Sequence, residues 1–179
     1  FVAEQGGNRI KVFDVTSISN GENAINILGQ SDFITATPSS TQSRLNAPQS
    51  LAYDIQGARL FVSELNGNRI KVFDVAAITD GEPAVNILGQ ANFTATSSSN
   101  TPSGLNDPRG IVYDSVHSRS FVSENINHRV KVFDVASITD GEEAVNVLGQ
   151  PDFVTANSVS TQSSILTPRM LAFDPVNSR

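Results

Sequence analysis

A fixed internal period constrains the fold of this chain more than any other feature of its sequence. The octapeptide NRIKVFDV occupies residues 8–15 and again 68–75, and its near copy HRVKVFDV occupies 128–135, so each copy starts 60 residues after the previous one. A constant period of this kind indicates one supersecondary unit repeated along the chain. We therefore interpret residues 1–179 as a single domain of three repeats, which span 1–60, 61–120 and 121–179.

The middle repeat contains four short apolar stretches separated by turn residues, and these cover Leu51–Tyr53, Leu60–Ser63, Arg69–Val75 and Val85–Leu88. In the third stretch Ile70 and Val72 alternate with Arg69 and Lys71, a period of two that is typical of a strand. An Asp-Gly turn precedes the fourth stretch. The pattern predicts an all-β chain in which each repeat supplies a four-stranded antiparallel sheet.

A connection of about 20 residues, rich in Ser, Thr, Asn and Pro, leads from the fourth stretch to the next repeat. Loops of this length are uncommon unless they have a role or pack on a neighbour. Apolar residues recur in it, and we expect these to pack on the adjacent sheet: Phe33, Phe93 and Phe153, with Leu45, Leu105 and Leu166. Four antiparallel strands with a crossover are the unit of a β-propeller blade.

The sequence resembles the NHL-repeat family at this point. The segment APQSLAYDIQGARLFVSELNGNRIKVFDV (47–75) is similar to its repeat, and LGQPDF (148–153) is similar to a segment that joins blades in long bacterial proteins of this type. The resemblance implies a β-propeller, commonly six-bladed, that acts as a binding or scaffolding module, although lyases and lactonases occur on similar propellers. A secreted or cell-envelope bacterial parent fits it, while the compartment stays unknown. The chain departs from the family at Glu4, Glu64 and Glu124, where the family usually has Asp.

Composition excludes several classes of partner and chemistry. The net charge is −6 and the chain has only three lysines, so it offers no basic face for nucleic acid or for an anionic membrane surface. The absence of cysteine excludes disulfides, thiol catalysis and thiolate metal sites. No apolar run approaches the roughly 20 residues of a membrane span.

A carboxylate precedes a guanidinium by five residues in every repeat, and the pairs are Glu4 with Arg9, Glu64 with Arg69, and Glu124 with Arg129. Such a pair can form a bidentate ion pair that braces the second and third strands. The alternative is a ligand clamp. Because the pair recurs in every repeat, we interpret it as structural.

Other polar residues give weaker indications. Asp54, Asp114 and Asp174 end the first strand of each unit, where they either cap the following turn, the interpretation we favour, or form a ring for a hard cation. His117 and His128 have no catalytic partners in the sequence pattern, and we expect both to lie on exposed loops. The sequence predicts no metal, no cofactor and no catalytic residue.

The residue type at one position of the repeat changes from copy to copy, although the strand residues around it recur. Gln49, Arg109 and Arg169 follow the proline that opens the first strand, which lies nearest the channel in a propeller. Variation there either tunes a binding surface at the channel mouth, for an unidentified protein, peptide or glycan, or is drift. We rank this position first among weak binding candidates.

The resulting hypothesis is a non-enzymatic binding or scaffolding module. A metal-dependent lyase or lactonase with calcium or zinc in the channel is the alternative, and an engineered or truncated fragment without a ligand is a third possibility. Three blades cannot close a ring, because propellers have about four to eight. The chain opens with a second strand, Phe1 to Glu4, and ends with a first strand, Met170 to Phe173. We therefore expect a homodimer that closes a six-bladed ring, with blades shared between chains at the termini.

Overall fold

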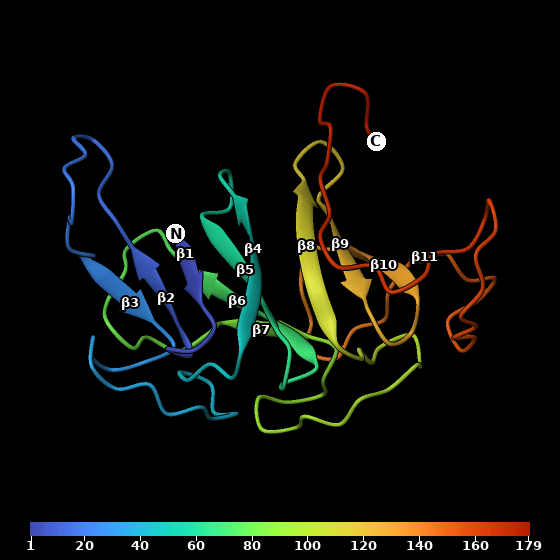
Figure 1. Cartoon of the computed structure of the whole chain (residues 1–179), viewed down its shortest axis with the longest axis horizontal. Helices are drawn as coiled ribbons and strands as arrows, with labels where there is room; N and C mark the ends of the chain where they lie inside the picture. The colour runs from blue at the N-terminus through green and yellow to red at the C-terminus, as the bar shows by residue number, and fades with distance from the viewer.

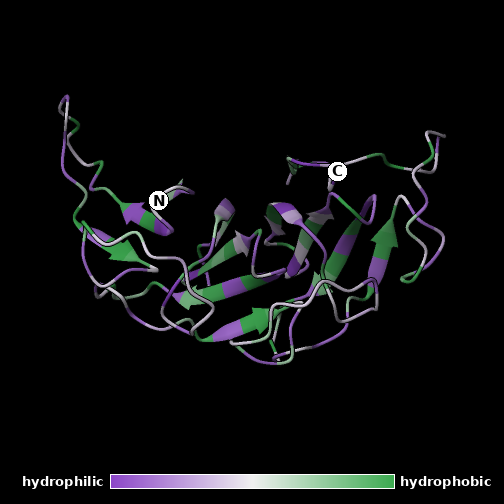
Figure 2. Ribbon diagram, turned by 60° about the horizontal axis from the view of Figure 1, so that its bottom comes forward, coloured by the Kyte–Doolittle hydropathy of each residue, from purple (hydrophilic) through white to green (hydrophobic).

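The three repeats form three antiparallel sheets that lie side by side along an open arc (Figures 1 and 2). A computed structural model describes residues 1–179. The first sheet has three strands: β1 (Val2–Glu4), β2 (Arg9–Val12) and β3 (Asn26–Leu28). The second has four: β4 (Pro48–Asp54), β5 (Arg59–Glu64), β6 (Arg69–Asp74) and β7 (Asn86–Leu88). The third repeats these four as β8 (Pro108–Asp114), β9 (Arg119–Glu124), β10 (Arg129–Asp134) and β11 (Asn146–Leu148).

This arrangement confirms the all-β prediction and the four-stranded meander of each complete sheet. Every strand pairs antiparallel with the strand next to it in sequence, in the orders β4-β5-β6-β7 and β8-β9-β10-β11. The first strands β4 and β8 contact each other, and β1, which has the place of a second strand, contacts β4 as β5 contacts β8. No helix in the chain is long and apolar enough to span a lipid bilayer.

The period-two pattern of β6 separates two buried faces rather than a buried face and a wet one. Ile70 and Val72 belong to the core shared with the third sheet, while Phe73 belongs to the core shared with the first. Arg69 and Lys71, on the same face as Phe73, are also fully buried. A sheet with neighbours on both sides must bury both faces, and a charged residue there needs partners.

Two apolar cores join the three sheets. The smaller one packs Ile10 and Leu28 of the first sheet against Leu60, Val62 and Phe73 of the second. The larger one packs the second sheet against the third, and its members include Phe61, Ile70, Val72, Leu88, Val122 and Phe133. Each repeat therefore buries its apolar faces only against its neighbours, as stacked repeats do.

The long connections, residues 29–47 and 89–107, are crossovers that pack between sheets, and residues 149–167 form the equivalent connection after the last sheet. Leu45 and Leu105 are fully buried in the two cores. Gly89 has a φ of +91°, and a Cβ built on it would lie 2.6 Å from Leu105 Cδ1, so only glycine fits beneath this leucine. In the third crossover the residue against Gly149 is Ile165. The prediction that Leu166 occupies this place was wrong: Leu166 lies one residue further on and is half exposed.

Residues 168–174 lie where a first strand would lie, although they form no strand ladder. The hydroxyl of Ser123 donates to the Arg169 carbonyl at 2.7 Å, just as Ser63 donates to the Arg109 carbonyl at 3.1 Å. Phe173 stacks on Phe121 at 5.8 Å between ring centroids. Residues 168–174 therefore contact the third sheet through one face. They form no strand because no other segment of the chain pairs with their backbone.

Candidate functional site

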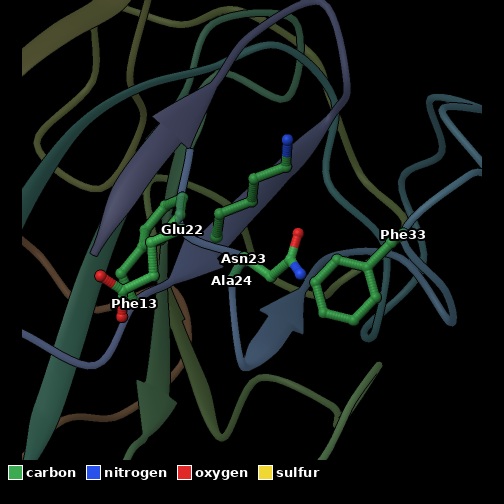
Figure 3. A pocket seen from close by; sticks show the side chains of 6 residues that line it. Phe13, Glu22, Asn23, Ala24 and Phe33 are labelled. Atoms are coloured by element: carbon green, nitrogen blue, oxygen red, sulfur yellow. The ribbon is translucent and has the colours of Figure 1, made fainter. Parts of the chain in front are cut away.

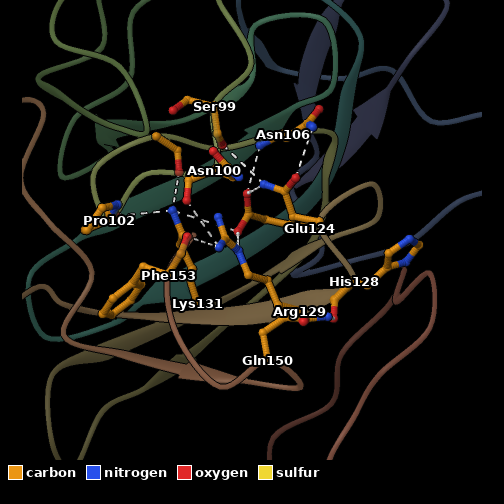
Figure 4. Close-up of polar contacts among 12 residues, drawn as sticks. Ser99, Asn100, Pro102, Asn106, Glu124, His128, Arg129, Lys131, Gln150 and Phe153 are labelled. Carbon is orange, nitrogen blue, oxygen red and sulfur yellow. Dashed lines mark hydrogen bonds and ion pairs between the residues drawn. The ribbon is translucent and has the colours of Figure 1, made fainter. Parts of the chain in front are cut away.

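A buried ion cluster lies at the turn between the second and third strands of each complete sheet, and Figure 4 shows the cluster of the third. Glu124 ends β9 and Arg129 begins β10, directly opposite it in the register. Arg129 Nε donates to Glu124 Oε2 at 2.5 Å, and Lys131 Nζ lies 3.9 Å from the same oxygen. All three side chains are fully buried.

This cluster binds two crossovers through their backbone. Lys131 donates to the carbonyls of Thr101, at 2.6 Å, and of Gly104, both in the crossover that precedes the sheet. Arg129 Nη1 donates to the carbonyl of Phe153 in the crossover that follows it. The other carboxylate oxygen of Glu124 accepts the backbone N–H of Asn106 at 2.9 Å (Figure 4). One charged triad therefore fastens a sheet to the connections on both sides of it.

The second sheet repeats the same arrangement. Arg69 Nε donates to Glu64 Oε2 at 2.5 Å, and Lys71 donates to the carbonyls of Thr41, at 2.6 Å, and of Arg44. In the two complete sheets, each predicted pair thus belongs to a triad. The sequence did not reveal its third member, the lysine. The available signal was that all three lysines of the chain, Lys11, Lys71 and Lys131, occupy one repeat position.

Burial sets the electrostatics of these clusters. Desolvation lowers the pKa of Lys71 and that of Lys131 from 10.5 to about 8, against the opposing attraction of the neighbouring glutamate. The ammonium groups are thus charged at neutral pH. The net charge of each triad, two cations and one carboxylate, is offset by backbone carbonyl dipoles. The Nη2 atoms of Arg69 and Arg129 are buried without a hydrogen-bond partner.

The first sheet carries an open version of the cluster. Arg9 Nε donates to Glu4 Oε2 at 2.8 Å and Lys11 Nζ lies 2.9 Å from that oxygen. Only the following crossover reaches this cluster, where Arg9 Nη1 donates to the Phe33 carbonyl at 2.5 Å, and no preceding crossover lies over it. The side chains of Glu4 and Lys11 are therefore 35% and 31% exposed, whereas their counterparts in the other sheets are at 0%. Hydrogen bonds from Arg9 and Lys11 lower the pKa of Glu4 from 4.5 to about 2. Lys11 has no carbonyl partner comparable with those of Lys71.

The three channel-mouth candidates lie at the same point of successive first strands. Gln49 and Arg109 sit where a β-bulge shifts the register of β4 and β8, and Arg169 occupies the equivalent place in the last segment. Arg109 forms an ion pair with Asp107, with Nη2 and Oδ2 3.1 Å apart, and Arg169 is exposed. None of the three lines a cavity. Their role in binding stays a prediction.

The repeated aspartates have the geometry of turn caps. Asp54 Oδ1 accepts the backbone N–H groups of Gln56, at 3.1 Å, and Gly57, at 3.0 Å, while its Oδ2 accepts two bonds from Arg59. Asp114 and Asp174 accept the equivalent backbone bonds. No group of three or more His, Cys, Asp or Glu side chains is arranged to hold a metal ion.

The two histidines differ from each other. His117 is exposed as expected, and its Nδ1 lies 2.8 Å from Asp114 Oδ2. His128 is not a free loop residue, because its Nδ1 accepts the backbone N–H of Thr167 at 3.1 Å. Asn8 and Asn68 make this contact in the other repeats through Oδ1, to residues 47 and 107. His128 does lie in the turn between β9 and β10, as predicted, but it is only partly exposed, and its side chain links one repeat to the next.

The first strands carry an apolar and aromatic surface that the sequence analysis did not identify. A cavity of about 370 Å³ lies over β4, β8 and the last segment, and Tyr53 and Ile55 in its wall are exposed. Its other apolar lining residues are Leu51, Ala52, Ile111, Val112, Tyr113, Phe173 and Pro175. Exposed apolar patches of this kind mark interaction surfaces.

No protein-family model and no curated protein matches the sequence. Among solved structures, the fold is similar to that of hydrazine synthase from Kuenenia stuttgartiensis, which contains a β-propeller. The TM-score is 0.56 at 14% sequence identity, and the match covers 96% of this chain and 34% of that one. This chain thus spans about a third of the length of the matched structure. At this identity the likeness shows the fold alone, and that fold is built of β-propeller blades; membership of the NHL-repeat family stays an expectation.

Proposed function

We propose that this chain is a non-enzymatic β-propeller module for binding or scaffolding, and that two copies close one six-bladed ring. The carrying observation is a pair of complementary edges. Residues 168–174 are seated as a first strand on the third sheet but lack a second strand. The first sheet begins with β1, which has the place of a second strand but lacks a first.

The repeat supplies the register in which these edges would pair. In the second sheet Pro48, Leu51 and Ala52 are opposite Glu64, Val62 and Phe61, and the third sheet has the same register. Moving each first-strand residue forward by two repeats, and each second-strand residue back by one, pairs Pro168, Leu171 and Ala172 with Glu4, Val2 and Phe1 of a second copy. Exposed strand edges favour association of this kind.

Closure follows from the number of blades. Propellers have about four to eight blades, and six is the only multiple of three in that range. Both joints of the ring are then the same contact, related by a twofold axis along the channel. In such a ring the apolar surface over β4 and β8 faces the channel, where it is accessible to a protein, peptide or glycan.

The non-enzymatic assignment is supported by the way the ionic residues are used. The charged clusters recur in every repeat and bind backbone groups of the chain itself, whereas catalysis needs one distinct set of groups. Elemental analysis after dialysis tests this assignment. A stoichiometric calcium or zinc ion that survives dialysis would overturn it in favour of a metal-dependent lyase or lactonase.

The proposed binding position is tested by a stability measurement on the double variant Arg109→Ala/Arg169→Ala. The Arg109 pair is partly exposed and Arg169 has no partner in the structure, so the loss should be below about 1 kcal/mol if these residues serve binding. A larger loss would assign them to the fold instead.

Deletion of residues 168–179 tests the ring. The deletion removes the segment that would complete the shared blade, so the shortened chain should elute as a monomer or as aggregates in gel filtration, while the full chain elutes as one discrete species. If the shortened chain forms the same species as the full chain, the shared-blade proposal is wrong.

A further inference from the structure

A cavity of about 430 Å³ opens beside the first sheet, next to the incomplete ion cluster (Figure 3). Its walls are formed by Lys11, Phe13, Glu22, Asn23, Ala24 and Phe33. In Figure 3, Phe33 projects from the crossover on one side, across from Phe13 and Glu22 on the other. The cavity therefore combines the Lys11 ammonium group, the Glu22 carboxylate and apolar surface.

The equivalent place is filled in the second sheet. The crossover residues 41–45 lie over Lys71, which donates to the carbonyls of Thr41 and Arg44. Gln42 exchanges two bonds with Ala84: its carbonyl accepts the Ala84 N–H at 3.2 Å, and its Nε2 donates to the Ala84 carbonyl at 2.8 Å. Both Ala84 and Phe73 are fully buried beneath the crossover, whereas Ala24 and Phe13 are partly exposed.

The third sheet repeats the pattern with a different sequence. Lys131 donates to the carbonyls of Thr101 and Gly104, and the Ala144 N–H donates to the Pro102 carbonyl at 3.1 Å. In both sheets the lysine thus donates hydrogen bonds to the backbone carbonyls of a short turn in the preceding crossover. Because the contacts are made to backbone, the side chains of the turn are free to vary.

We propose that the cavity beside Lys11 is the docking site for residues 161–166 of a second copy of this chain. This proposal deepens the ring proposed above and rests on it. By the repeat, Lys11 Nζ would donate to the carbonyls of Thr161 and Ser164, and Gln162 would exchange two bonds with Ala24. The Leu166 N–H would donate to Glu4, as the Asn46 N–H donates to Glu64 at 2.7 Å.

The docking segment already has the conformation that the site requires. Its Ser164 N–H donates to the Thr161 carbonyl at 3.4 Å, as Arg44 donates to Thr41 at 3.4 Å and Gly104 to Thr101 at 3.3 Å. Ile165 already packs on Gly149, as Leu105 packs on Gly89. A turn that is ordered before binding loses little conformational entropy when it docks.

The chemical character of residues 161–166 also suits the cavity beside Lys11. Carbonyl oxygens offer a buried ammonium group acceptors without adding a second carboxylate. The segment 156–167 contains no charged residue, so it can cover Glu4, Arg9 and Lys11 without burying an unpaired charge. Docking would convert the open cluster into the fully buried triad seen around Lys71.

Acetylation of native protein tests whether Lys11 becomes covered. The three lysines are distinguished by peptide mass spectrometry, and the mass of the assembly is measured on the same sample. If the chain is a dimer and docking occurs, Lys11 should react as slowly as the buried Lys71. A dimer in which Lys11 reacts at least about tenfold faster than Lys71 would overturn the docking and leave the ring. A monomer with fast Lys11 would overturn both.

A matched pair of variants tests which segment docks. Gln162→Ala would remove one hydrogen bond at each of the two joints, which should raise the dimer dissociation constant about 30-fold. Gln42→Ala removes the equivalent bond inside one chain and should leave the dissociation constant unchanged. Equal dissociation constants for the two variants would overturn the assignment of residues 161–166.

Discussion

Replacement of Arg69 tests the interpretation of the buried clusters as structural. In Arg69→Ala the Glu64 carboxylate stays fully buried, 3.7 Å from Lys71, and the Phe93 carbonyl loses its donor. Removing one partner of a buried ion pair costs about 3–5 kcal/mol. A stranded carbonyl adds to this cost, while Lys71 offsets part of it, so we expect a loss of about 3–5 kcal/mol in the free energy of unfolding.

Urea unfolding at one fixed protein concentration measures this loss, because an oligomer's stability depends on concentration. Two variants separate the causes. Arg69→Met retains most of the side-chain volume and should lose nearly as much as Arg69→Ala if the stranded charge dominates. Arg109→Ala breaks a partly exposed pair and should cost about 0.2–1 kcal/mol. An Arg69→Met variant within about 1 kcal/mol of the parent would refute the reasoning.

Three further perturbations follow from the same structure. Burial lowers the pKa of Lys71 and Lys131 to about 8, so the unfolded chain binds more protons than the folded chain between pH 8 and 10.5. The contribution of these two lysines to the free energy of unfolding should therefore rise with pH over this window. A urea midpoint whose pH dependence stays the same when these lysines are replaced would contradict this. His128→Asn restores the amide found in the other repeats, so the variant should melt no lower than the parent, and a clearly lower melting temperature would contradict the equivalence of the three contacts. Gly89→Ala should lose about 1–3 kcal/mol in urea unfolding because its φ is +91° and the crossover leucine occupies the Cβ position, whereas Gly6→Ala, with open space around it, should lose less than about 1 kcal/mol.

The sequence predicted the blade fold because the period and the strand pattern are local properties. Arg69–Val75 was expected as the third strand, and β6 covers Arg69–Asp74. The first strand is longer than predicted, Pro48–Asp54 rather than Leu51–Tyr53, because the pairing continues past a bulge at Gln49 and Ser50 to Pro48, which lies opposite Glu64. A bulge is set by tertiary contacts, here the hydroxyl of Ser63, and leaves no regular pattern in the sequence.

The site was predicted less completely. The carboxylate and guanidinium of each pair are five residues apart and meet across one turn, so spacing alone indicated them. Lys71 meets its partners 30 and 27 residues away, in a crossover whose path the sequence does not specify. For the same reason Ile165 was missed in favour of Leu166, since only the packed structure shows which of two adjacent apolar residues faces Gly149.

The mass of the chain in solution tests the central claim most directly. Light scattering coupled to gel filtration should give one species of twice 19.1 kDa, because two chains of three blades close a six-bladed ring and leave no free edge. A folded monomer of 19.1 kDa that persists at high protein concentration, or a trimer, would contradict the account.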